Sequence, residues 1–474
     1  MTHSLDPIKF GTDGWRAEIA REFTFANVER VAQAYADYLT SEIKNPQTES
    51  LVVIGFDRRF HSENFAQRVA EILTGNGFPL AMFSEPVPTP LVSWAVKDQS
   101  ATGGVVITAS HNPPHFNGFK IKAPWGGSAS PETTAAVEKL VDSSPAKRKE
   151  FTNSASNERL QDSLRSYRAQ VESYIDLDRL KRAAVSVIVD PMHGSGGSWV
   201  ESFITGGQLK VETIRALRDP LFGGINPEPI DQNLAALKAR VSATNSIVGL
   251  ATDGDADRVG AVNERGETMT MHEVVPLLLL HLARERKMTG GVVRTFSQSV
   301  LTKRIAEAHG LKVYETPIGF KYVADLMLRD DILIGAEESG GIGVKNHIPE
   351  RDGILNSLLL LETILVAGKP PSELVREMHR EFGEFYFGRR DLHMDVRRGQ
   401  DFVQRLAVDP PAVIGDEKVS GLETIDGTKL MFADESWLLF RQSGTEPMLR
   451  IYCEATSQAK RDRLLGLGVE AARK

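Results

Sequence analysis

Along the first part of the chain, segments with apolar residues at the helical period alternate with short apolar runs. After a loop over 10–19, residues 27–43 carry apolar side chains at the helical period and predict a helix. The apolar runs 51–56 and 80–83 predict strands, and the stretch between them predicts a second helix that Ser62 caps. This alternation predicts a parallel sheet with helices on both faces and with ligands at the carboxyl ends of its strands.

The same alternation continues as far as residue 382. Further strands are predicted at 103–107, 185–189, 246–252, 292–295, 311–314 and 332–335. Beyond residue 382 the pattern changes, because it predicts strands at 385–394 and 430–454, an Asp426-Gly427 turn and a closing helix at 459–472. Four domains are therefore predicted, the last of them α+β, over 1–157, 158–262, 263–382 and 383–474.

The stretch 102–122 joins an apolar strand directly to a polar loop. Residues 103–107 begin with glycine and are β-branched, which is typical of a strand buried on both faces. Two consecutive prolines soon afterwards end the strand, because proline cannot donate to a sheet ladder. Ser110 is thus held at a strand end, with His111 and Lys120 as candidates for moving a proton or binding phosphate. A polar turn without a chemical role is the alternative at this point.

The sequence DGDADR places three carboxylates at alternate positions. Asp253, Asp255 and Asp257 can converge on one hard cation, because oxygen ligands suit magnesium or calcium. An EF-hand loop is rejected, since its sixth position needs glycine where Arg258 stands, and strands rather than helices are predicted on both sides. A solvated acidic turn is the remaining alternative.

Three other loops carry groups that suit a phosphorylated sugar. Glu337, Glu338 and Ser339, in AEESGG, can accept from and donate to sugar hydroxyls, and Arg16 can bind phosphate. Two arginines, two hydroxyls and a glycine near the C-terminus can bind a phosphate dianion: Arg441, Ser443, Gly444, Thr445 and Arg450. A surface hairpin is the alternative for the loop near the C-terminus, and a salt-bridged surface arginine is the alternative for Arg16. The HGSGG turn over 193–197 lacks the Lys-Ser/Thr ending of a phosphate loop and is interpreted as structural.

Composition narrows the class of protein. The chain has 474 residues, 41% of them hydrophobic and 25% charged, as in ordinary globular proteins. A net charge of −7 argues against nucleic acid as the main partner. Cys453 is the only cysteine, which excludes an intramolecular disulfide and suits a reducing cytoplasm. Residues 1–15 lack the pattern of a secretory signal, and 354–367 is too short to span a bilayer and predicts a buried amphipathic helix.

Together these loops resemble those of the α-D-phosphohexomutase family, which includes phosphoglucomutases and phosphomannomutases. Its markers FGTDGWR, TASHNP, NGFKIK, DGDADR, GAEESGG and RQSGTEP occur in family order and cover almost the whole chain. The resemblance implies an α/β fold of three successive α/β/α domains with mixed sheets, plus a C-terminal α+β domain, around a central cleft. It implies an intramolecular phosphotransferase that interconverts hexose 1-phosphate and hexose 6-phosphate. Glucose is favoured, with mannose possible, because GAEESGGIGVKNHIPERDG resembles the phosphoglucomutase side of the family.

The resemblance also implies roles for individual residues. Ser110 would be the phosphoserine and would bind Mg²⁺ together with the three aspartates, while His111, Lys120 and Arg16 would take part in catalysis. The substrate-binding residues would be Arg258, Gly319, Lys321, Glu337, Ser339, Arg441, Ser443, Gly444, Thr445 and Arg450. A hexose 1,6-bisphosphate would be the intermediate and activator. One departure is Ala17, where the family motif usually continues with glycine and a methyl group could shift the backbone beside Arg16.

Two alternative functions stay open. The first is a hexose-1,6-bisphosphate synthase that releases the bisphosphate and takes its phosphoryl group from another sugar bisphosphate. The second is a catalytically idle sugar-phosphate sensor, against which the intact Ser110 and the three intact aspartates count. In each case we expect small sugar phosphates as partners, no nucleic acid or membrane partner, and a cytoplasmic location, while the oligomeric state stays open.

Overall fold

The computed structural model describes residues 7–11, 13–42, 50–152, 156–443 and 447–473. They fall into two compact units. The first unit comprises Met1–Met269 and Gly340–Pro371, and the second comprises Thr270–Ser339 and Ser372–Lys474.

The first sheet of the first unit has the strand order β1-β5-β4-β2-β3. Its elements are β1 (Trp15–Glu18), α1 (Phe25–Glu42), β2 (Val52–Phe56), α2 (Ser62–Gly75), β3 (Leu80–Met82), α3 (Thr89–Asp98), β4 (Gly103–Ile107), β5 (Phe116–Lys122) and α4 (Pro131–Leu140). The side chains of β4 alternate between two cores: Val105 and Ile107 pack with α1, α2 and α4, whereas Val106 packs with α3 and with α5 (Ser156–Tyr174). β4 is therefore buried on both faces, as its composition predicts.

Three details of this region differ from the sequence-based expectations. β1 lies within the segment expected as a loop. Ser62 does not cap α2: His61 occupies the cap position, its side chain makes no capping hydrogen bond to the helix backbone, and Ser62 donates to Asp57 at 2.7 Å. The sheet is mixed, as the family resemblance implies, rather than parallel, as the alternation of strands and helices alone predicts, because β5 runs antiparallel to both β4 and β1. A parallel crossover needs about a dozen residues or more, which the connection 108–115 does not supply.

The second sheet of the first unit has the order β10-β9-β8-β6-β7. The elements that build and cover it are α6 (Leu177–Arg182), β6 (Ser186–Asp190), α7 (Trp199–Ile204), β7 (Lys210–Thr213), η1 (Phe222–Gly224), η2 (Asp231–Asn233), α8 (Ala235–Thr244), β8 (Val248–Thr252), β9 (Val259–Asn263) and β10 (Thr268–Met269). β14 (Ile342–Val344) and α12 (Gly353–Ala367), from later in the chain, belong to the same unit. β6, β7 and β8 are parallel, whereas β9 and β10 are antiparallel additions. The chain thus reverses direction in the short loop between β8 and β9, at the carboxyl end of the buried strand β8.

Helix α12 is buried as expected but is not amphipathic. Every residue from Gly353 to Ile364 is buried. Two of its polar side chains have partners inside the unit: Asn356 donates to the carbonyl of Ile342, and Glu362 accepts from the backbone of Asp176. Over the described part of the chain, no single helix is long and apolar enough to cross a membrane; α12 and α13 (Pro371–Phe382) meet the length and composition test only as a pair bent by 77°.

The second unit contains a parallel arrangement of three strands and an antiparallel sheet. The first part comprises α9 (Met271–Leu280), η3 (His281–Glu285), β11 (Gly291–Thr295), α10 (Val300–Ala308), β12 (Val313–Thr316), α11 (Phe320–Arg329) and β13 (Ile332–Ala336). The antiparallel sheet has the order β15-β20-β19-β18-β17-β16. Its elements are β15 (Tyr386–His393), α14 (Val396–Val408), β16 (Val413–Ile414), β17 (Glu417–Glu423), β18 (Thr428–Phe432), β19 (Trp437–Gln442), β20 (Met448–Ala455) and α15 (Gln458–Arg473). β16, β17 and α14 had no counterpart in the sequence-based prediction.

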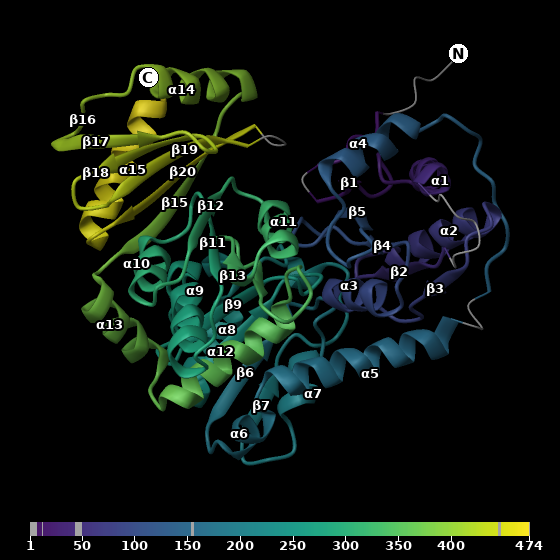
Figure 1. The fold of residues 1–474 in the computed structure, drawn as a ribbon, viewed down its shortest axis with the longest axis horizontal. Helices are drawn as coiled ribbons and strands as arrows, with labels where there is room; N and C mark the ends of the chain where they lie inside the picture. Colours follow the sequence, from purple (N-terminus) through teal and green to yellow (C-terminus); the bar gives the residue numbers. More distant parts are fainter. Residues whose placement is uncertain (1–6, 12, 43–49, 153–155, 444–446, 474) are drawn as a thin grey trace. The chain divides into compact units, whose positions relative to one another are not determined.

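The two faces of this antiparallel sheet differ in chemistry. Leu438, Phe440 and Ile451 lie in a core with α14 and α15, whose ribbons lie against the sheet in Figure 1. Side chains alternate along a strand, so the intervening residues project from the opposite face. That face carries three arginines: Arg441 is opposite Arg450, and Arg389 is opposite Tyr452. The fold class predicted from the sequence is confirmed: three α/β/α domains with mixed sheets precede a C-terminal α+β domain.

Candidate active site

Ser110 lies just beyond β4, in a backbone conformation that is uncommon for a residue with a side chain. Its φ is 53°, in the left-handed region, and its side chain is buried. Its backbone N–H donates to Thr108 Oγ1 at 2.9 Å, and its hydroxyl donates to Asp253 Oδ2 at 2.8 Å. His111 Nδ1 lies 3.3 Å from the same hydroxyl oxygen. The serine oxygen is therefore placed between a histidine and the acidic loop.

Arg59 fixes the loop that presents Ser110, and sequence analysis missed this residue. The Arg59 side chain is completely buried. Its guanidinium donates to four backbone carbonyls of the loop, those of Ser110, Asn112, Pro113 and Phe116, at 2.6 to 3.1 Å. The sequence did contain an indication of this role. The charged residues that follow β2 at its carboxyl end are Asp57, Arg58 and Arg59, and β2 lies beside β4.

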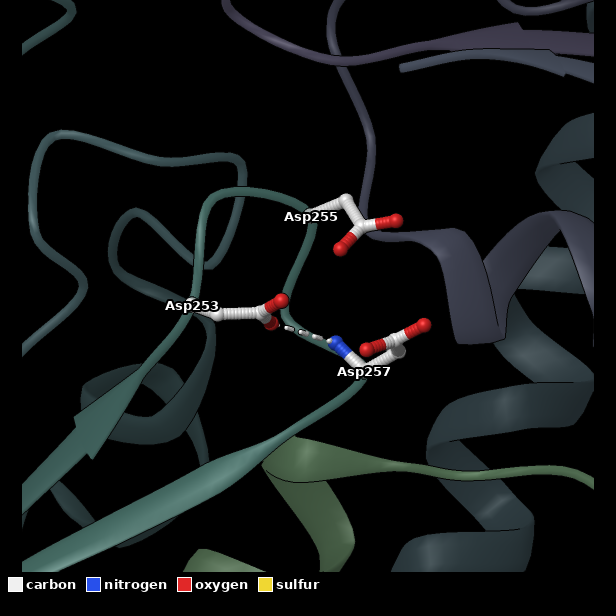
Figure 2. A group of neighbouring side chains, drawn as sticks. All are labelled: Asp253, Asp255 and Asp257. Atoms are coloured by element: carbon white, nitrogen blue, oxygen red, sulfur yellow. Dashed lines mark hydrogen bonds between the residues drawn. The ribbon is translucent and has the colours of Figure 1, made fainter. Parts of the chain in front are cut away.

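The three aspartates of DGDADR converge as predicted. One carboxylate oxygen from each lies within 4.8 Å of the others, and Figure 2 shows all three on the loop between β8 and β9. Asp253 Oδ1 accepts from the backbone N–H of Asp257 at 3.1 Å. Asp255 Oδ1 and Asp257 Oδ1 are buried without a hydrogen-bond partner among the described residues. Buried carboxylate oxygens that lack donors are what a divalent cation with oxygen ligands requires.

Charge repulsion within the triad also favours a cation. Burial and the nearby charges of Asp255 and Asp257 raise the pKa of Asp253 well above its usual value. Burial alone would raise the pKa of Asp255 as well, but Lys120 and the hydrogen bond from Thr89 hold it below the usual value. A bound divalent cation would relieve this repulsion. The residues present therefore fit a magnesium site.

Lys120 supplies a positive charge beside the triad. Its Nζ lies 2.9 Å from Asp255 Oδ2, 2.9 Å from Asp13 Oδ2 and 3.4 Å from Asp257 Oδ2. Burial alone would lower the pKa of Lys120, but these three carboxylates outweigh it and raise the pKa. Lys120 is therefore a charged ammonium at neutral pH.

His111 has the opposite protonation state. Burial, together with the charges of Arg258, Arg16 and Lys120, lowers the pKa of His111 well below its usual value. The imidazole is therefore neutral at neutral pH. Of the two candidate proton carriers, only His111 combines a neutral ring with a position beside the Ser110 hydroxyl.

Arg16 and Ala17 lie on β1, next to the serine loop. Arg16 donates to Asn112 Oδ1 at 2.6 Å and lies 3.4 Å from Asp13 Oδ2. Ala17 is paired with Asn117 in the regular β1–β5 register. The Ala17 methyl group is thus accommodated in a regularly paired strand.

Asp13, Glu350 and Arg351 form a buried ionic network around the triad that sequence analysis did not predict. Arg351 Nη2 lies 2.9 Å from both Asp13 Oδ2 and Asp257 Oδ2. Glu350 Oε2 lies 2.9 Å from Lys122 Nζ. The Lys122–Glu350 and Asp13–Arg351 contacts join segments that are 228 and 338 residues apart along the chain, so nothing in the local sequence pattern revealed them.

Within this network, the ion pair of Glu350 and Lys122 makes the stability of the protein sensitive to acid. Burial would raise the pKa of Glu350, but Lys122 and Arg351 lower it from 4.5 to about 2. A depressed carboxyl pKa contributes stability that is complete above pH 4.5 and is lost as the pH falls toward 2, about 3 kcal/mol in all. Glu350→Gln mimics the protonated side chain. We therefore expect the melting temperature of Glu350→Gln to lie well below that of the parent at pH 7 and to approach it at pH 3.

The control for this prediction is Glu150→Gln, because Glu150 is exposed. Its melting temperature should follow the parent at every pH in a calorimetric series. If the melting temperature of Glu350→Gln lay below that of the parent by the same amount from pH 7 to pH 3, the ion pair of Glu350 and Lys122 would make no pH-dependent contribution to stability.

The acidic loop reaches Ser110 because glycines allow its backbone to come close. A Cβ atom on Gly254 would lie 2.4 Å from the Ser110 carbonyl oxygen. The Gly-rich turn packs behind the same loop, since Ser195 N donates to the Gly254 carbonyl at 2.9 Å and a Cβ on Gly194 would lie 2.7 Å from that oxygen. These contacts favour the structural interpretation of the HGSGG turn.

We expect Gly254→Ala to separate the serine from the aspartates. The added methyl meets backbone, so the two loops must move apart by some tenths of an ångström to an ångström, and activity should fall by about 100-fold. Gly466→Ala is the matched control, because its Cβ would meet nothing within 4 Å. Steady-state assays of both variants test this. Full activity in Gly254→Ala would contradict a requirement for close approach.

Arg258 follows Asp257 directly in the first unit, and the remaining predicted residues lie in the second unit. Glu337 is buried and Ser339 half-buried at the end of β13, while Gly319, with φ 139°, precedes α11 and Lys321 lies in its first turn, 4.9 Å from the centre of the Tyr322 ring. Arg441 and Arg450 are opposite one another on β19 and β20, and the buried Ser443 follows β19. Gly444 and Thr445 lie outside the described residues.

Comparison with known proteins identifies the family of this chain. Models of the phosphoglucomutase/phosphomannomutase family match it in four parts: alpha/beta/alpha domain I over 7–148, domain II over 165–266, domain III over 271–382 and the C-terminal domain over 395–466. The chain belongs to this family. Family members are phosphomutases, so this phosphohexomutase is an intramolecular phosphotransferase.

Relatives of this phosphohexomutase differ in the sugar for which they are named. A "Phosphoglucomutase/phosphomannomutase" of Thermococcus kodakarensis is 32% identical over 461 residues, 97% of each chain. A "Phosphoglucosamine mutase" of Halorhodospira halophila is 28% identical over 471 residues, 98% of this chain and 96% of that one. The solved structure of a "putative phosphomannomutase" from Thermus thermophilus is 36% identical and covers 99% of this chain and 100% of its own, with a TM-score of 0.85. The relatives agree on the class of reaction and differ in the sugar.

Proposed function

We propose that the protein interconverts hexose 1-phosphate and hexose 6-phosphate through phosphorylated Ser110 and a hexose 1,6-bisphosphate intermediate. The observation that supports this most strongly is the buried Ser110 hydroxyl, 2.8 Å from Asp253 of an aspartate triad that retains two carboxylate oxygens without donors among the described residues. A serine activated for acyl transfer needs a base and an oxyanion hole, whereas a serine that carries phosphate needs positive charge for the phosphoryl group.

The bond changes of the proposed cycle are balanced. A hydroxyl oxygen of the hexose monophosphate attacks the phosphorus on Ser110, and the bond from Ser110 Oγ to phosphorus breaks. The sugar hydroxyl loses its proton and the serine oxygen takes one up, which leaves a hexose 1,6-bisphosphate and free Ser110. After the bisphosphate has reversed its orientation, the same step in reverse returns its other phosphate to the serine.

Asp253, Asp255, Asp257 and the Ser110 oxygen are the groups that would hold Mg²⁺. Bound Mg²⁺ supplies positive charge that stabilises the transferring phosphoryl group. Lys120 adds a fixed positive charge beside the same carboxylates. We assign the proton of the Ser110 oxygen to His111, because its neutral imidazole lies 3.3 Å away, whereas Lys120 is held as a cation.

The second unit would recognise the rest of the substrate. Arg441 and Arg450, which are adjacent across β19 and β20, would bind the non-reacting phosphate, with Ser443, Gly444 and Thr445 as further donors. Glu337 and Ser339 would hold the sugar hydroxyls. Gly319 and Lys321, at the start of α11, would help to distinguish the two substrate orientations, and Arg16 and Arg258 would add positive charge beside the serine.

The test is a panel of substrates followed by phosphorus NMR with Mg²⁺ and a trace of bisphosphate. We expect glucose 1-phosphate to equilibrate with glucose 6-phosphate faster than the mannose and glucosamine phosphates react, because the block around 335–353 resembles that of phosphoglucomutases. Net accumulation of hexose 1,6-bisphosphate in place of the monophosphate would instead indicate a bisphosphate synthase. No turnover of any of these sugars would contradict the proposal.

A further inference from the structure

The basic face of the C-terminal sheet already carries its own anions. Asp426 Oδ2 lies 3.0 Å from Arg441 Nε, and Asp391 accepts from Arg389 at 2.8 and 2.6 Å. The side chains of Arg441 and Asp426 are only 19% and 23% exposed, so solvent screens their attraction less than at an open surface. The arginine assigned to the substrate phosphate is therefore already paired with a resident carboxylate.

Asp426 contacts a second element of the same unit. The oxygen that faces Arg441 also accepts from the backbone N–H of Ile318, at 2.9 Å. Ile318 immediately precedes Gly319, the residue in front of α11. One carboxylate oxygen thus engages the phosphate-binding arginine and the loop that we assign to substrate orientation.

A mutase makes a demand on its phosphate site that a simple binding protein does not. The site must first bind the phosphate of the substrate. It must then let go of that phosphate while the bisphosphate intermediate reverses its orientation, and bind the other phosphate of the intermediate. Strong binding of the intermediate does not speed this cycle, because binding that is equal in all states slows release without lowering the chemical barrier. A nearby anion that competes for the arginine would weaken binding and speed release.

We propose that Asp426 is a resident counter-anion that competes with the substrate phosphate for Arg441. This competition allows the phosphate of the bisphosphate intermediate to leave Arg441. This inference rests on the proposed function. When the phosphate departs, Asp426 neutralises the guanidinium, and its bond to Ile318 keeps the adjoining loop in place. When the phosphate returns, the two anions share one guanidinium, and their mutual repulsion lowers the affinity.

A carboxylate that only positions Arg441 would have the opposite effect. Such a residue orders the guanidinium before the ligand arrives, so its removal weakens ligand binding. Removal of a competing anion strengthens it. The sign of the change in affinity therefore distinguishes a counter-anion from a positioning residue.

The experiment measures binding of glucose 1-phosphate and glucose 6-phosphate by calorimetry in the full chain carrying Ser110→Ala, which prevents turnover. Asp426→Asn removes the charge but retains an oxygen acceptor for the Ile318 N–H. We expect this variant to bind both monophosphates about threefold to tenfold more tightly, with a smaller gain at high salt. Asp426→Glu, which retains the charge, should bind like the parent.

Asp416→Asn is the matched control, because Asp416 pairs with Arg463 on the exposed surface of the same unit and should leave affinity unchanged. With Ser110 intact, Asp426→Asn should lower kcat by about threefold to tenfold, at an unchanged melting temperature. Unchanged or weaker binding in Asp426→Asn, or an undiminished kcat, would overturn this inference but not the proposed function. If the Ser110→Ala parent binds none of the glucose, mannose or glucosamine phosphates, the proposed function fails and the inference fails with it.

Discussion

Replacement of Ser110 by alanine is expected to lower hexose phosphate interconversion by about 10⁴-fold or more, equivalent to about 5.5 kcal/mol of transition-state stabilisation. In the proposed cycle every phosphoryl group passes through the Ser110 oxygen, so no partial route remains when that oxygen is absent. Coupled assays of glucose 1-phosphate conversion measure the loss. The protein should still fold, because alanine is no more strained than serine at a φ of 53°.

Ser173→Ala is the control for this prediction, since Ser173 is exposed on α5. It should retain full activity. Ser110→Ala should also still bind hexose phosphates, because the residues assigned to the distal phosphate and the sugar hydroxyls are untouched. Interconversion by Ser110→Ala at more than a few per cent of the parent rate would contradict the assignment of Ser110 as the phosphate carrier.

Asp255→Asn should produce the second largest loss. The substitution removes one of three converging negative charges and leaves Lys120 with one fewer partner for its ammonium group. Changes to groups around a metal ligand already cost about 10- to 100-fold in metal affinity, so removal of a ligand charge should cost at least about 100-fold. Titration of activity with Mg²⁺ should show both a higher requirement for the ion and a lower maximum rate.

Glu267→Gln is a suitable comparison, because Glu267 is exposed in the turn at the other end of β9. Its magnesium requirement should equal that of the parent. Calorimetric titration of the Ser110→Ala protein with Mg²⁺ gives a second measurement that does not depend on turnover. An Asp255→Asn protein with the parent's magnesium affinity would rule out Asp255 as a ligand.

The parts of the site that sequence could predict are local in the chain. Ser110 follows a contiguous apolar strand, and the three aspartates alternate within six residues bounded by strands, so hydrophobic pattern and ligand chemistry suffice to find them. Side-chain partners from distant segments could not be found in this way. Arg351 meets Asp257 only because the segment before α12 folds back onto the acidic loop, where the N–H of Gly353 donates to Ala256 at 3.0 Å.

The errors in the predicted fold also have physical causes. The antiparallel addition of β5 depends on the length of the serine loop, which the alternation of strands and helices does not encode. β17 was missed because polar and charged residues interrupt its short apolar pattern, as is usual near the edge of a sheet. Asp426 was predicted only as part of a turn, whereas its contacts with Arg441 and Ile318 arise from the packing of the C-terminal sheet within its unit.

The most direct test of the central proposal is the phosphorylation state of Ser110 during turnover. The protein is incubated with glucose 1,6-bisphosphate and Mg²⁺, digested, and analysed by mass spectrometry before and after a chase with glucose 6-phosphate. We expect one phosphate on the peptide that contains Ser110, and its loss during the chase as new glucose 1,6-bisphosphate forms. Continued turnover with no phosphate on Ser110, or with the phosphate on another residue, would contradict it.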